Sequence, residues 1–310
     1  MPKKYQKALV TGGAGFIGSH IVDALIKRRI KVYVVDDLST GKKSNVNPNA
    51  KFIKLSINNP QFPKLIKRMK PDIIFHFAAQ IDVRAAVADP PKDARTNIMG
   101  TVTLAHHAAI NGVKKIVFAS TGGAMYPDTV KPPHSEKIPP QPISPYGIAK
   151  RASEMYLHFA YLTHGIQYVC LRYANVYGPR QNPKAEAGVI SIFSERMLNG
   201  SPVTINGDGK QTRDFVYVED VVRANMIAMR KNVSGVFNIG TGKQTNMNSL
   251  FKKLRKIIGS NTPEHHGPAA HGEVLRSSLD CRKARKMLGW ESKVKVDDGL
   301  KKTVKWFQRK

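Results

Sequence analysis

Short runs of apolar residues alternate with longer amphipathic segments over the first half of the chain. Six runs have the length and composition of buried strands: "KALV", "IKVYVVDD", "KFIKL", "PDIIFHFAA", "KKIVFAS" and "IQYVCLRY". Segments such as "NIMGTVTLAHHAAINGV", and the residues that follow Pro145, carry apolar positions at helical spacing. Strands that alternate with helices indicate a doubly wound parallel sheet covered on both faces, so we predict an α/β fold.

The alternation weakens beyond residue 175, where shorter elements follow the loop sequence "NVYGPRQNPKAEAG". We predict a first domain over residues 1–175 and a second, smaller mixed α/β domain over residues 176–310. Segments near residues 212–240, which include "RDFVYVEDVVRANMIAMR" and "VFNIG", are expected to return to the first sheet.

Length and composition fit an ordinary globular protein. The 310 residues are 41% hydrophobic, which is enough for one large core or two modest ones. No apolar run approaches the roughly 18 residues of a membrane span, and "MPKKYQKALV" leads straight into a strand, so we expect a cytoplasmic protein. Cys170 and Cys281 lie far apart without CxxC spacing, which indicates neither a disulfide framework nor a zinc site. His265, His266 and His271 lack partners at ligand spacing, so no metal is expected.

Positive charge is the outlier of the composition. The 50 Lys and Arg residues against 22 Asp and Glu residues give a formal net charge of +28 at pH 7. Such a charge permits attraction to nucleic acid, anionic membranes or phosphorylated small molecules. The basic residues are spread through "IKRRIK", "KLIKRMK", "LFKKLRK" and residues 282–310, between apolar positions at helical intervals. Solvated helix faces are therefore favoured, and neither a nucleic-acid partner nor a membrane is expected.

A glycine-rich turn, "TGGAGFIG", joins the first predicted strand to the first helix. Gly12, Gly15 and Gly18 permit a tight turn, a close approach of the backbone to a pyrophosphate, and close packing of helix against strand. The amides at the helix N-terminus would face the phosphates. Asp36, eighteen residues after Gly18, ends the second strand, where a carboxylate binds ribose hydroxyls and repels a 2′-phosphate. With Asp37 beside it, the pattern predicts a Rossmann-type sheet that binds NAD rather than NADP.

Candidate catalytic side chains follow the fifth strand. Ser120 and Thr121 lie at its carboxyl end, where open α/β sheets bind ligands. In "ISPYGIAK", Tyr146 and Lys150 lie four residues apart, on one face of a predicted helix. A phenol is a poor base at neutral pH, but the Lys150 ammonium and a positive nicotinamide would both favour the phenolate. Tyr146 would then remove a proton from a substrate hydroxyl while hydride leaves the same carbon.

These motifs occur in one order with "DDLSTG", "HFAAQ", "TNIMGT", "STGGAMY", "LRYANVYGPRQ", "GDGKQTRDFVYVEDV" and "FNIGTG". In this order, over nearly its whole length, the chain resembles the extended short-chain dehydrogenase/reductase family and, within it, the UDP-glucose 4-epimerase-like nucleotide-sugar enzymes. Tyr146 is then implied as the base, Lys150 as its electrostatic partner and ribose ligand, and Thr121 as the hydroxyl that binds the reacting oxygen. The resemblance also implies a homodimer, which packs through the helix of residues 97–110 and the helix that begins near Tyr146.

The resemblance extends to the residues that line both ligand sites. For NAD these are Gly12, Gly15, Phe16, Ile17, Gly18, Asp36, Asp37, Ser39, Thr40, Gly41, Ser56, Ile57, Phe77, Ala78, Ala79, Gln80, Asn97, Ser120, Tyr146, Lys150, Tyr173 and Val176. For the UDP-sugar they are Thr121, Tyr146, Asn175, Val189, Ile205, Arg213 and Ser277.

The activity that the resemblance implies is 4-epimerisation of a UDP-sugar, by oxidation at C4, rotation of the 4-keto intermediate and reduction from the other face. NAD is then tightly bound and recycled. UDP-glucose and UDP-galactose are the expected pair, and it stays open whether the N-acetylated pair is accepted alongside them. A UDP-glucuronate epimerase, a net dehydrogenase or reductase, and a basic NAD-binding protein without catalysis also stay open. Gly122 and Gly123 follow Thr121, so elimination of water lacks its obvious proton carriers.

Four positions depart from the family pattern or leave a choice open. Ala270 stands where relatives carry an arginine of the diphosphate clamp, a contact worth roughly 1.5 to 3 kcal/mol. Ser56 stands where an aspartate usually meets the adenine. Thr121 lies one residue farther from Tyr126 than in many relatives, which leaves Ser120 as an alternative hydroxyl. Ser277 stands where a bulky residue excludes N-acetyl sugars, so its small side chain would admit them.

Overall fold

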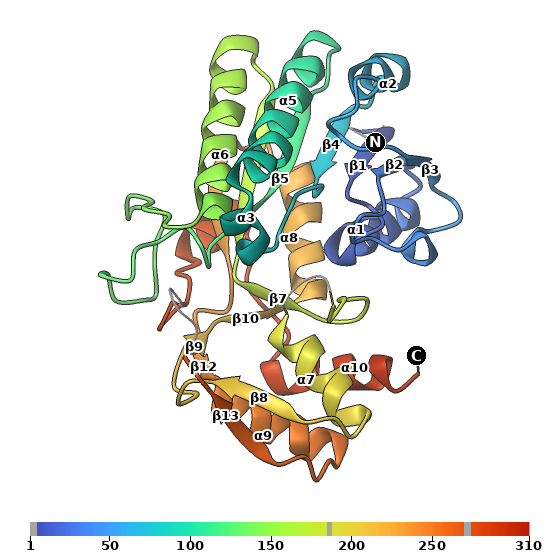
Figure 1. Ribbon diagram of the computed structural model, residues 1–310. Helices are drawn as coiled ribbons and strands as arrows, with labels where there is room; N and C mark the ends of the chain where they lie inside the picture. Colours follow the sequence, from blue (N-terminus) through green and yellow to red (C-terminus); the bar gives the residue numbers. More distant parts are fainter. Residues whose placement is uncertain (1–4, 185–187, 270–273, 310) are drawn as a thin grey trace.

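The computed structural model describes residues 5–184, 188–269 and 274–309. A large α/β layer structure occupies the upper part of the molecule, and a smaller group of helices and short strands lies below it (Figure 1). The two parts meet where β7 (Asn175–Tyr177) pairs in parallel with β10 (Phe215–Tyr217).

The central sheet has seven parallel strands in the order β11-β6-β5-β4-β1-β2-β3. Their bounds are β1 Lys7–Thr11, β2 Lys31–Asp36, β3 Lys51–Lys54, β4 Ile73–His76, β5 Lys115–Thr121, β6 Gln167–Tyr173 and β11 Gly235–Ile239. The α/β prediction is confirmed: the six expected runs all form strands, and "VFNIG" supplies the seventh. Because the strand order reverses between β1 and β4, a crevice opens at the carboxyl ends of these strands, where such sheets bind ligands.

Helices cover both faces of the sheet. Successive residues of each strand point to opposite faces and are mostly apolar, so both faces must be buried. Ala8 and Val10 of β1 pack in one buried cluster and Leu9 packs in another. The first cluster lies under α1 (Phe16–Lys27) and α8 (Val218–Arg230); the second lies under α2 (Phe62–Met69), α5 (Gly100–Ile110) and α6 (Pro145–His164) (Figure 1). These buried runs carry no polar alternation because both of their faces are covered.

The remaining elements of the upper part are short. Between β4 and α5 the chain forms α3 (Val83–Ala88), α4 (Pro90–Ala94) and the π-helical turn η2 (Arg95–Met99). The other two short turns are η1 (Lys43–Asn45), after β2, and η3 (Ala284–Leu288). Trp290, just beyond η3, is buried in the cluster under α8 and donates its indole N–H to the carbonyl of Asp220.

The lower part has its own hydrophobic cluster between three helices. These helices are α7 (Val189–Leu198), α9 (Met247–Ile258) and α10 (Val296–Phe307). Beside them, β8 (Val203–Asn206) pairs in parallel with β13 (Glu264–Gly267), and β9 (Thr212–Arg213) pairs in antiparallel fashion with β12 (Thr245–Asn246). The chain crosses between the parts several times, since α8 and β11 pack on the large sheet and α9 lies in the lower group (Figure 1).

Candidate active site

The turn between β1 and α1 is shaped by glycines that no other residue could replace without a shift of backbone. Gly12 has φ +68°, and a Cβ at this position would lie 2.5 Å from the backbone nitrogen of Ala78. A Cβ at Gly18 would lie 2.2 Å from the carbonyl oxygen of Gly12. The turn is therefore packed against the end of β4 and against its own helix, which leaves the start of α1 able to receive phosphates.

Asp36 closes the other end of this cradle. Its Oδ2 accepts a hydrogen bond from the amide of Ala14 and its Oδ1 accepts one from the amide of Leu38, both at 2.9 Å. Burial raises the pKa of Asp36 and the two amides oppose that shift. The side chain is thus held at the end of β2, where a ribose with free hydroxyls fits and a 2′-phosphate would meet a carboxylate. These contacts fit the adenosine half of NAD.

A cavity of about 410 Å³ extends from the glycine turn to the start of α6. The predicted cofactor residues that line it are Gly12, Gly15, Phe16, Ile17, Gly18, Asp36, Asp37, Ser39, Thr40, Ser56, Ile57, Phe77, Ala78, Ala79, Gln80, Ser120, Tyr146, Lys150 and Tyr173. Gly41, Asn97 and Val176 lie outside this lining. The structure adds Val35, Leu55, Asn58, Ile81, Asp82, Lys92, Thr96 and Ala119. Asn58 supplies a side-chain amide beside Ser56, the position at which an aspartate was expected to meet the adenine.

Helix α6 presents Tyr146 and Lys150 to this cavity because of how it begins. The hydroxyl of Ser144 accepts from the amide of Gly147, and Pro145 occupies the first turn, so the helix starts just before the tyrosine. Lys150 follows one turn later, with its Nζ 5.7 Å from the centroid of the Tyr146 ring. Both side chains thus lie on one face of α6, as the spacing predicted.

Lys150 is buried but well partnered. Its Nζ donates to the carbonyl of Ala119 at 2.9 Å and lies 4.7 Å from the centroid of the Phe118 ring. Burial lowers the pKa of Lys150 to about 8, while Asp93 and other negative groups act in the opposite direction. The ammonium is therefore still largely charged near pH 7.

Without a positive nicotinamide beside it, the protein raises the pKa of the Tyr146 phenol rather than lowering it. Burial raises the pKa of the Tyr146 phenol above its ordinary value, and the carboxylate of Asp93 raises it further. In the protein alone, desolvation and the charge of Asp93 therefore outweigh any stabilisation of the phenolate by Lys150.

The two candidate hydroxyls at the end of β5 have different surroundings. Ser120 borders the cavity, but its Oγ donates to Oε1 of Glu154 at 2.7 Å. Among the described residues, the Oγ1 of Thr121 accepts only a long hydrogen bond, 3.3 Å, from the amide of Ala124. Thr121 is also partly exposed, whereas Ser120 is buried. The threonine hydroxyl is therefore the one left available to a ligand.

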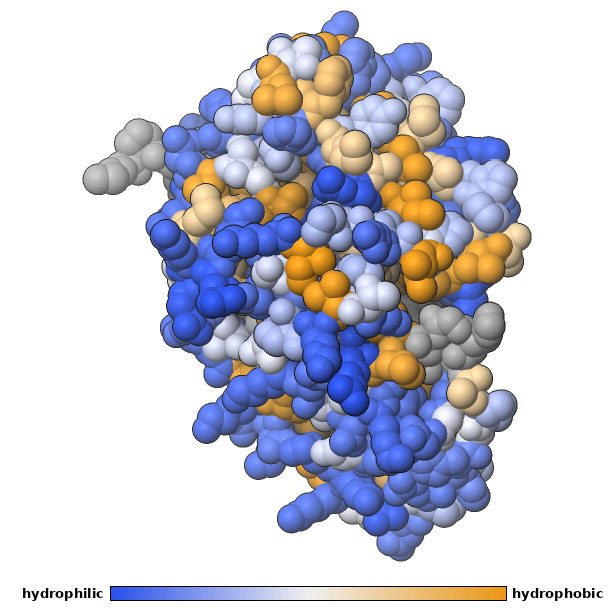
Figure 2. Space-filling view, turned by 90° about the vertical axis from the view of Figure 1, so that its left-hand side faces the viewer, coloured by the Kyte–Doolittle hydropathy of each residue, from blue (hydrophilic) through white to orange (hydrophobic). Residues whose placement is uncertain are grey.

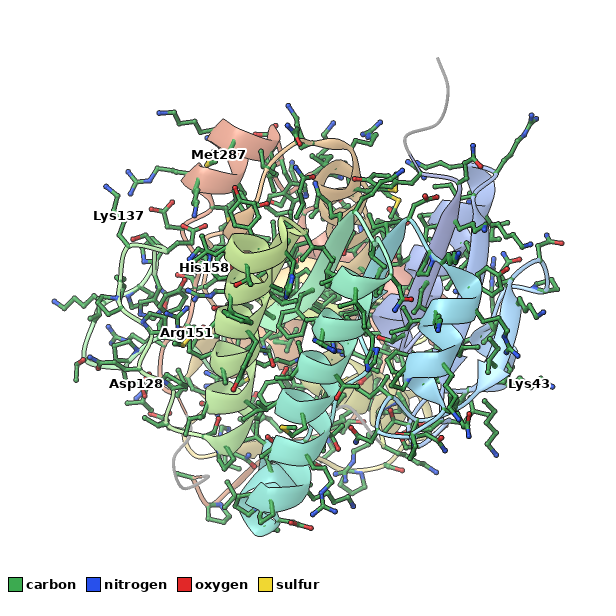
Figure 3. The ribbon with its side chains drawn as sticks, turned by 90° about the horizontal axis from the view of Figure 1, so that it is seen from above. Lys43, Asp128, Lys137, Arg151, His158 and Met287 are labelled. Atoms are coloured by element: carbon green, nitrogen blue, oxygen red, sulfur yellow. The ribbon has the colours of Figure 1, made fainter. Side chains whose placement is uncertain are left out.

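Glu154 belongs to a buried ionic cluster that the sequence did not reveal. Arg172 of β6 donates to it through Nε at 2.8 Å and through a terminal nitrogen at 2.6 Å. Arg172 also donates to the hydroxyl of Tyr126, which in turn donates to Asn238. Arg151, 3.3 Å from Glu154, lies on the side of α6 turned toward the loop that carries Asp128 and Lys137 (Figure 3). The cluster ties α6 to β6 one helical turn beyond Lys150.

The predicted substrate residues come from several elements. Asn175 lies in β7, and Val189 begins α7. Arg213 in β9 donates to the carbonyls of Thr212 and Val274, and the amide of Ser277 donates to the carbonyl of Thr212. Arg213 and Ser277 therefore lie on adjoining backbone segments. Ala270 lies outside the described residues, as does His271.

Ile205 does not present its side chain to a ligand. It is 1% exposed and packs with Val203 in the hydrophobic cluster of the lower part. Residues of β8 alternate between buried and exposed, so Thr204 and Asn206 point outward while Ile205 points inward. Only the backbone of this segment could contact a bound group at this position.

Asp214 is a second buried carboxylate that sequence reasoning missed. Its oxygens accept from the amides of Thr241, Gly242 and Leu279 and from the Thr241 hydroxyl. It therefore joins the segment of Arg213 to the segment of Ser277. The available signal for this role was a carboxylate directly before the apolar run "FVYV".

Comparison with known proteins agrees with this geometry. The profile of the NAD dependent epimerase/dehydratase family matches residues 8–240, which include the glycine turn, Asp36, Thr121, Tyr146 and Lys150. The chain belongs to this family. It is an NAD-dependent enzyme of the extended short-chain dehydrogenase/reductase type.

Three solved members of the family are similar to the chain over its whole length. The UDP-glucose 4-epimerase of Thermotoga maritima, in a structure with UDP-glucose, is 51% identical with a TM-score of 0.96, covering 98% of this chain and 99% of that one. The UDP-glucose 4-epimerase of Thermus thermophilus, in complex with NAD, is 39% identical with a TM-score of 0.93, covering 97% and 99%. The UDP-N-acetylglucosamine 4-epimerase of Methanobrevibacter ruminantium, in complex with UDP-N-acetylmuramic acid, is 35% identical with a TM-score of 0.93, covering 99% of each.

Within residues 5–184, 188–269 and 274–309, no three His, Cys, Asp or Glu side chains gather so that they could hold a metal ion. Over the same part of the chain, no helix has the length and hydrophobicity needed to cross a membrane.

Proposed function

We propose that this family member catalyses the 4-epimerisation of a UDP-sugar. The observation that carries the proposal is that Tyr146 and Lys150 line one end of a cavity whose other end is the glycine turn with Asp36, and that Thr121 directly follows Ser120, a further lining residue, at the end of β5. Relatives that share this architecture carry names of UDP-sugar 4-epimerases.

The three side chains divide the proton chemistry among them. Bound NAD would accept a hydride from C4 of the sugar and later return it. Tyr146 removes the proton of the C4 hydroxyl and gives it back after the sugar has turned over. Thr121 donates a hydrogen bond to the same oxygen, and the Lys150 ammonium stabilises the phenolate. Because burial and Asp93 raise the pKa of Tyr146, a further positive charge at the site is required before Tyr146 can act as a base at neutral pH.

The residues after Thr121 support epimerisation over elimination. Gly122 and Gly123 offer no acid or base to carry protons from C5 and C6. A Cβ at Gly122 would lie 2.5 Å from Leu279, so this position has no room for a carboxylate. A net dehydrogenase is distinguished by experiment, because it would release the reduced cofactor.

The sugar is the open part of the proposal. Ser277 is buried, and its hydroxymethyl side chain takes little volume, which supports a pocket that admits N-acetylated as well as plain hexoses. We therefore propose UDP-glucose and UDP-galactose, with UDP-GlcNAc and UDP-GalNAc, as the substrate set.

A direct assay tests the function. The purified enzyme is incubated separately with UDP-galactose, UDP-GalNAc and UDP-galacturonate, and the C4 epimers are separated afterwards. We expect epimers of the first two substrates, with no net absorbance change at 340 nm during turnover. Stoichiometric reduction of added NAD, or no epimer from any substrate, would contradict the proposal.

We also propose that the enzyme is a homodimer. Large apolar side chains are exposed on α3, η2, α5 and α6, namely Val83, Val87, Met99, Ile110, Ile148, Met155, Tyr156, Phe159, Tyr161 and Leu162. Hydrophobic residues gather in the upper half of the molecule in Figure 2, and the lower half is mainly hydrophilic. Exposed apolar surface of this extent marks a protein interface. Two antiparallel copies of this face would bury it.

Sedimentation tests this arrangement. A Phe159→Glu, Leu162→Glu double variant that sediments as a monomer would support it. A wild-type monomer at micromolar concentration would refute it.

A further inference from the structure

Asp93 is a buried carboxylate that neither ligand site uses directly. It lies in α4 and is 1% exposed. Its Oδ1 accepts from Nδ2 of Asn97 at 2.9 Å and from Nε2 of Gln80 at 3.1 Å. None of the ion pairs of the described residues includes it. A buried carboxylate without a contacting cation carries a desolvation penalty of several kcal/mol, so its charge calls for an explanation.

The first role that the geometry gives Asp93 is to orient Asn97. The Asn97 amide clasps the backbone of Gln80, since Nδ2 donates to the carbonyl at 2.8 Å and Oδ1 accepts from the amide at 2.9 Å. Because Nδ2 also donates to Asp93, the amide cannot turn over without losing a bond at each end. Gln80 lines the cofactor cavity, so this clasp fixes one of its walls.

The second role concerns charge at the catalytic pair. Asp93 acts on both Lys150 and Tyr146, and it raises the pKa of each. Lys150 also experiences Glu154 and Cys170, while His76 of β4 faces it as a neutral ring, since burial lowers the pKa of His76 to about 3. Of these groups, Asp93 alone acts on Tyr146 as well. Its negative charge therefore keeps Lys150 protonated and at the same time keeps Tyr146 protonated.

We propose that Asp93 is a positioning residue for hydride transfer: through Asn97 it fixes the Gln80 wall of the cofactor cavity, and its carboxylate sets the charge balance of the Tyr146 and Lys150 pair. This inference rests on the proposed function, because it assigns a role in the reaction of Tyr146 and Lys150. The two roles of Asp93, support of the Asn97 clasp and supply of a negative charge, can be tested separately. Asparagine in place of Asp93 keeps the acceptor oxygen and removes only the charge.

The test compares Asp93→Asn and Asp93→Ser, which are neutral, with Asp93→Glu, which keeps the charge. Asp89→Asn is the matched control, because Asp89 is exposed, caps α4 through a bond that asparagine can also accept, and loses the same unit of charge. For each variant the thermal midpoint, the retained NAD and the pH dependence of kcat for UDP-galactose epimerisation are measured.

Loss of the charge lowers the pKa of Tyr146 and that of Lys150 together, so both limbs of the pH profile move in one direction. We expect the profiles of Asp93→Asn and Asp93→Ser to shift toward acid by roughly half a unit or more. Asp93→Glu and Asp89→Asn should keep the wild-type profile. Asp93→Ser, which also breaks the clasp, should retain at most half as much NAD as Asp93→Asn.

Coincident profiles for the wild type and a folded neutral variant would overturn the charge role, whatever the change in kcat. Equal NAD retention by Asp93→Ser and the wild type would overturn the clasp. Wild-type turnover in the same assay tests the proposed function separately, so the comparison between variants bears on Asp93 alone.

Discussion

The hydroxyl of Ser120 donates a 2.7 Å hydrogen bond to Glu154, and this contact turns it from the cavity toward the buried ionic cluster. The neighbouring hydroxyl of Thr121 has no comparable partner among the described residues. Two adjacent hydroxyls, which the sequence could not distinguish, thus have separate surroundings: the Ser120 hydroxyl is bonded to the ionic cluster, and the Thr121 hydroxyl is available to a ligand.

Thr121→Ala should therefore reduce kcat about 100-fold or more, because it removes a donor to the reacting oxygen. Ser120→Ala should reduce kcat far less and should lower the free energy of unfolding by about 1.5 to 3 kcal/mol, since it removes a hydrogen bond to a charged group. Initial rates and urea unfolding of both variants provide the comparison. A larger catalytic loss in Ser120→Ala than in Thr121→Ala would reverse our assignment.

The ionic cluster gives a prediction about stability. Arg172→Met leaves the Glu154 carboxylate buried without its main partner and should cost about 3 to 5 kcal/mol of unfolding free energy. The double variant Arg172→Met, Glu154→Leu removes both charges and should recover much of this loss. Urea unfolding of the single and double variants measures the difference. If the double variant is no more stable than the single one, the buried charge is not the source of the cost.

Gly12 offers a prediction with a close control in the same chain. Gly12 and Gly112 both have positive φ, +68° and +74°, but a Cβ at Gly112 would meet no atom within 4 Å. Gly112→Ala should cost about 1 kcal/mol from its backbone conformation alone. Gly12→Ala should show the same cost, a further loss from the clash with Ala78, and little retained NAD. Unfolding curves and the cofactor content of the purified variants test this, and normal NAD content in Gly12→Ala would argue against the cradle.

Ser277 is expected to control the choice of sugar. Ser277→Tyr should reduce kcat/KM for UDP-GalNAc at least about 10-fold more than for UDP-galactose, because an added ring would occupy the space of the N-acetyl group. Ser277→Ala keeps the volume small and should leave the ratio near its wild-type value. Parallel assays on the two substrates give the ratio directly. An equal loss on both substrates after Ser277→Tyr would mean that the residue affects binding in general.

Local pattern was sufficient for most of the fold and for the catalytic pair. The strands, the glycine turn and the Tyr146 and Lys150 spacing depend on periodicity, turn chemistry and helix geometry within a few residues. Ser144 and Pro145 place the start of α6 by the same local rules. These features could be predicted because neighbouring residues determine them.

Features that depend on tertiary packing could not be predicted in this way. Asp93 and Glu154 resemble surface carboxylates in sequence, and only the packing of α4 and α6 buries them. The upward shift of the Tyr146 pKa in the protein alone was missed for the same reason, because desolvation depends on what covers the phenol. Ile205 was expected to border the substrate, but the alternation of a short strand turns it into the core.

The central claim is that Tyr146 moves the proton while hydride leaves C4. Tyr146→Phe removes the phenolic oxygen and keeps the ring, and Tyr156→Phe, at an exposed tyrosine of the same helix, is its control. The decisive measurement is the rate of C4-epimer formation from UDP-galactose by folded Tyr146→Phe that contains bound NAD. We predict a loss of at least about 1,000-fold, with Tyr156→Phe unchanged. A rate within a few-fold of the wild type would contradict the mechanism.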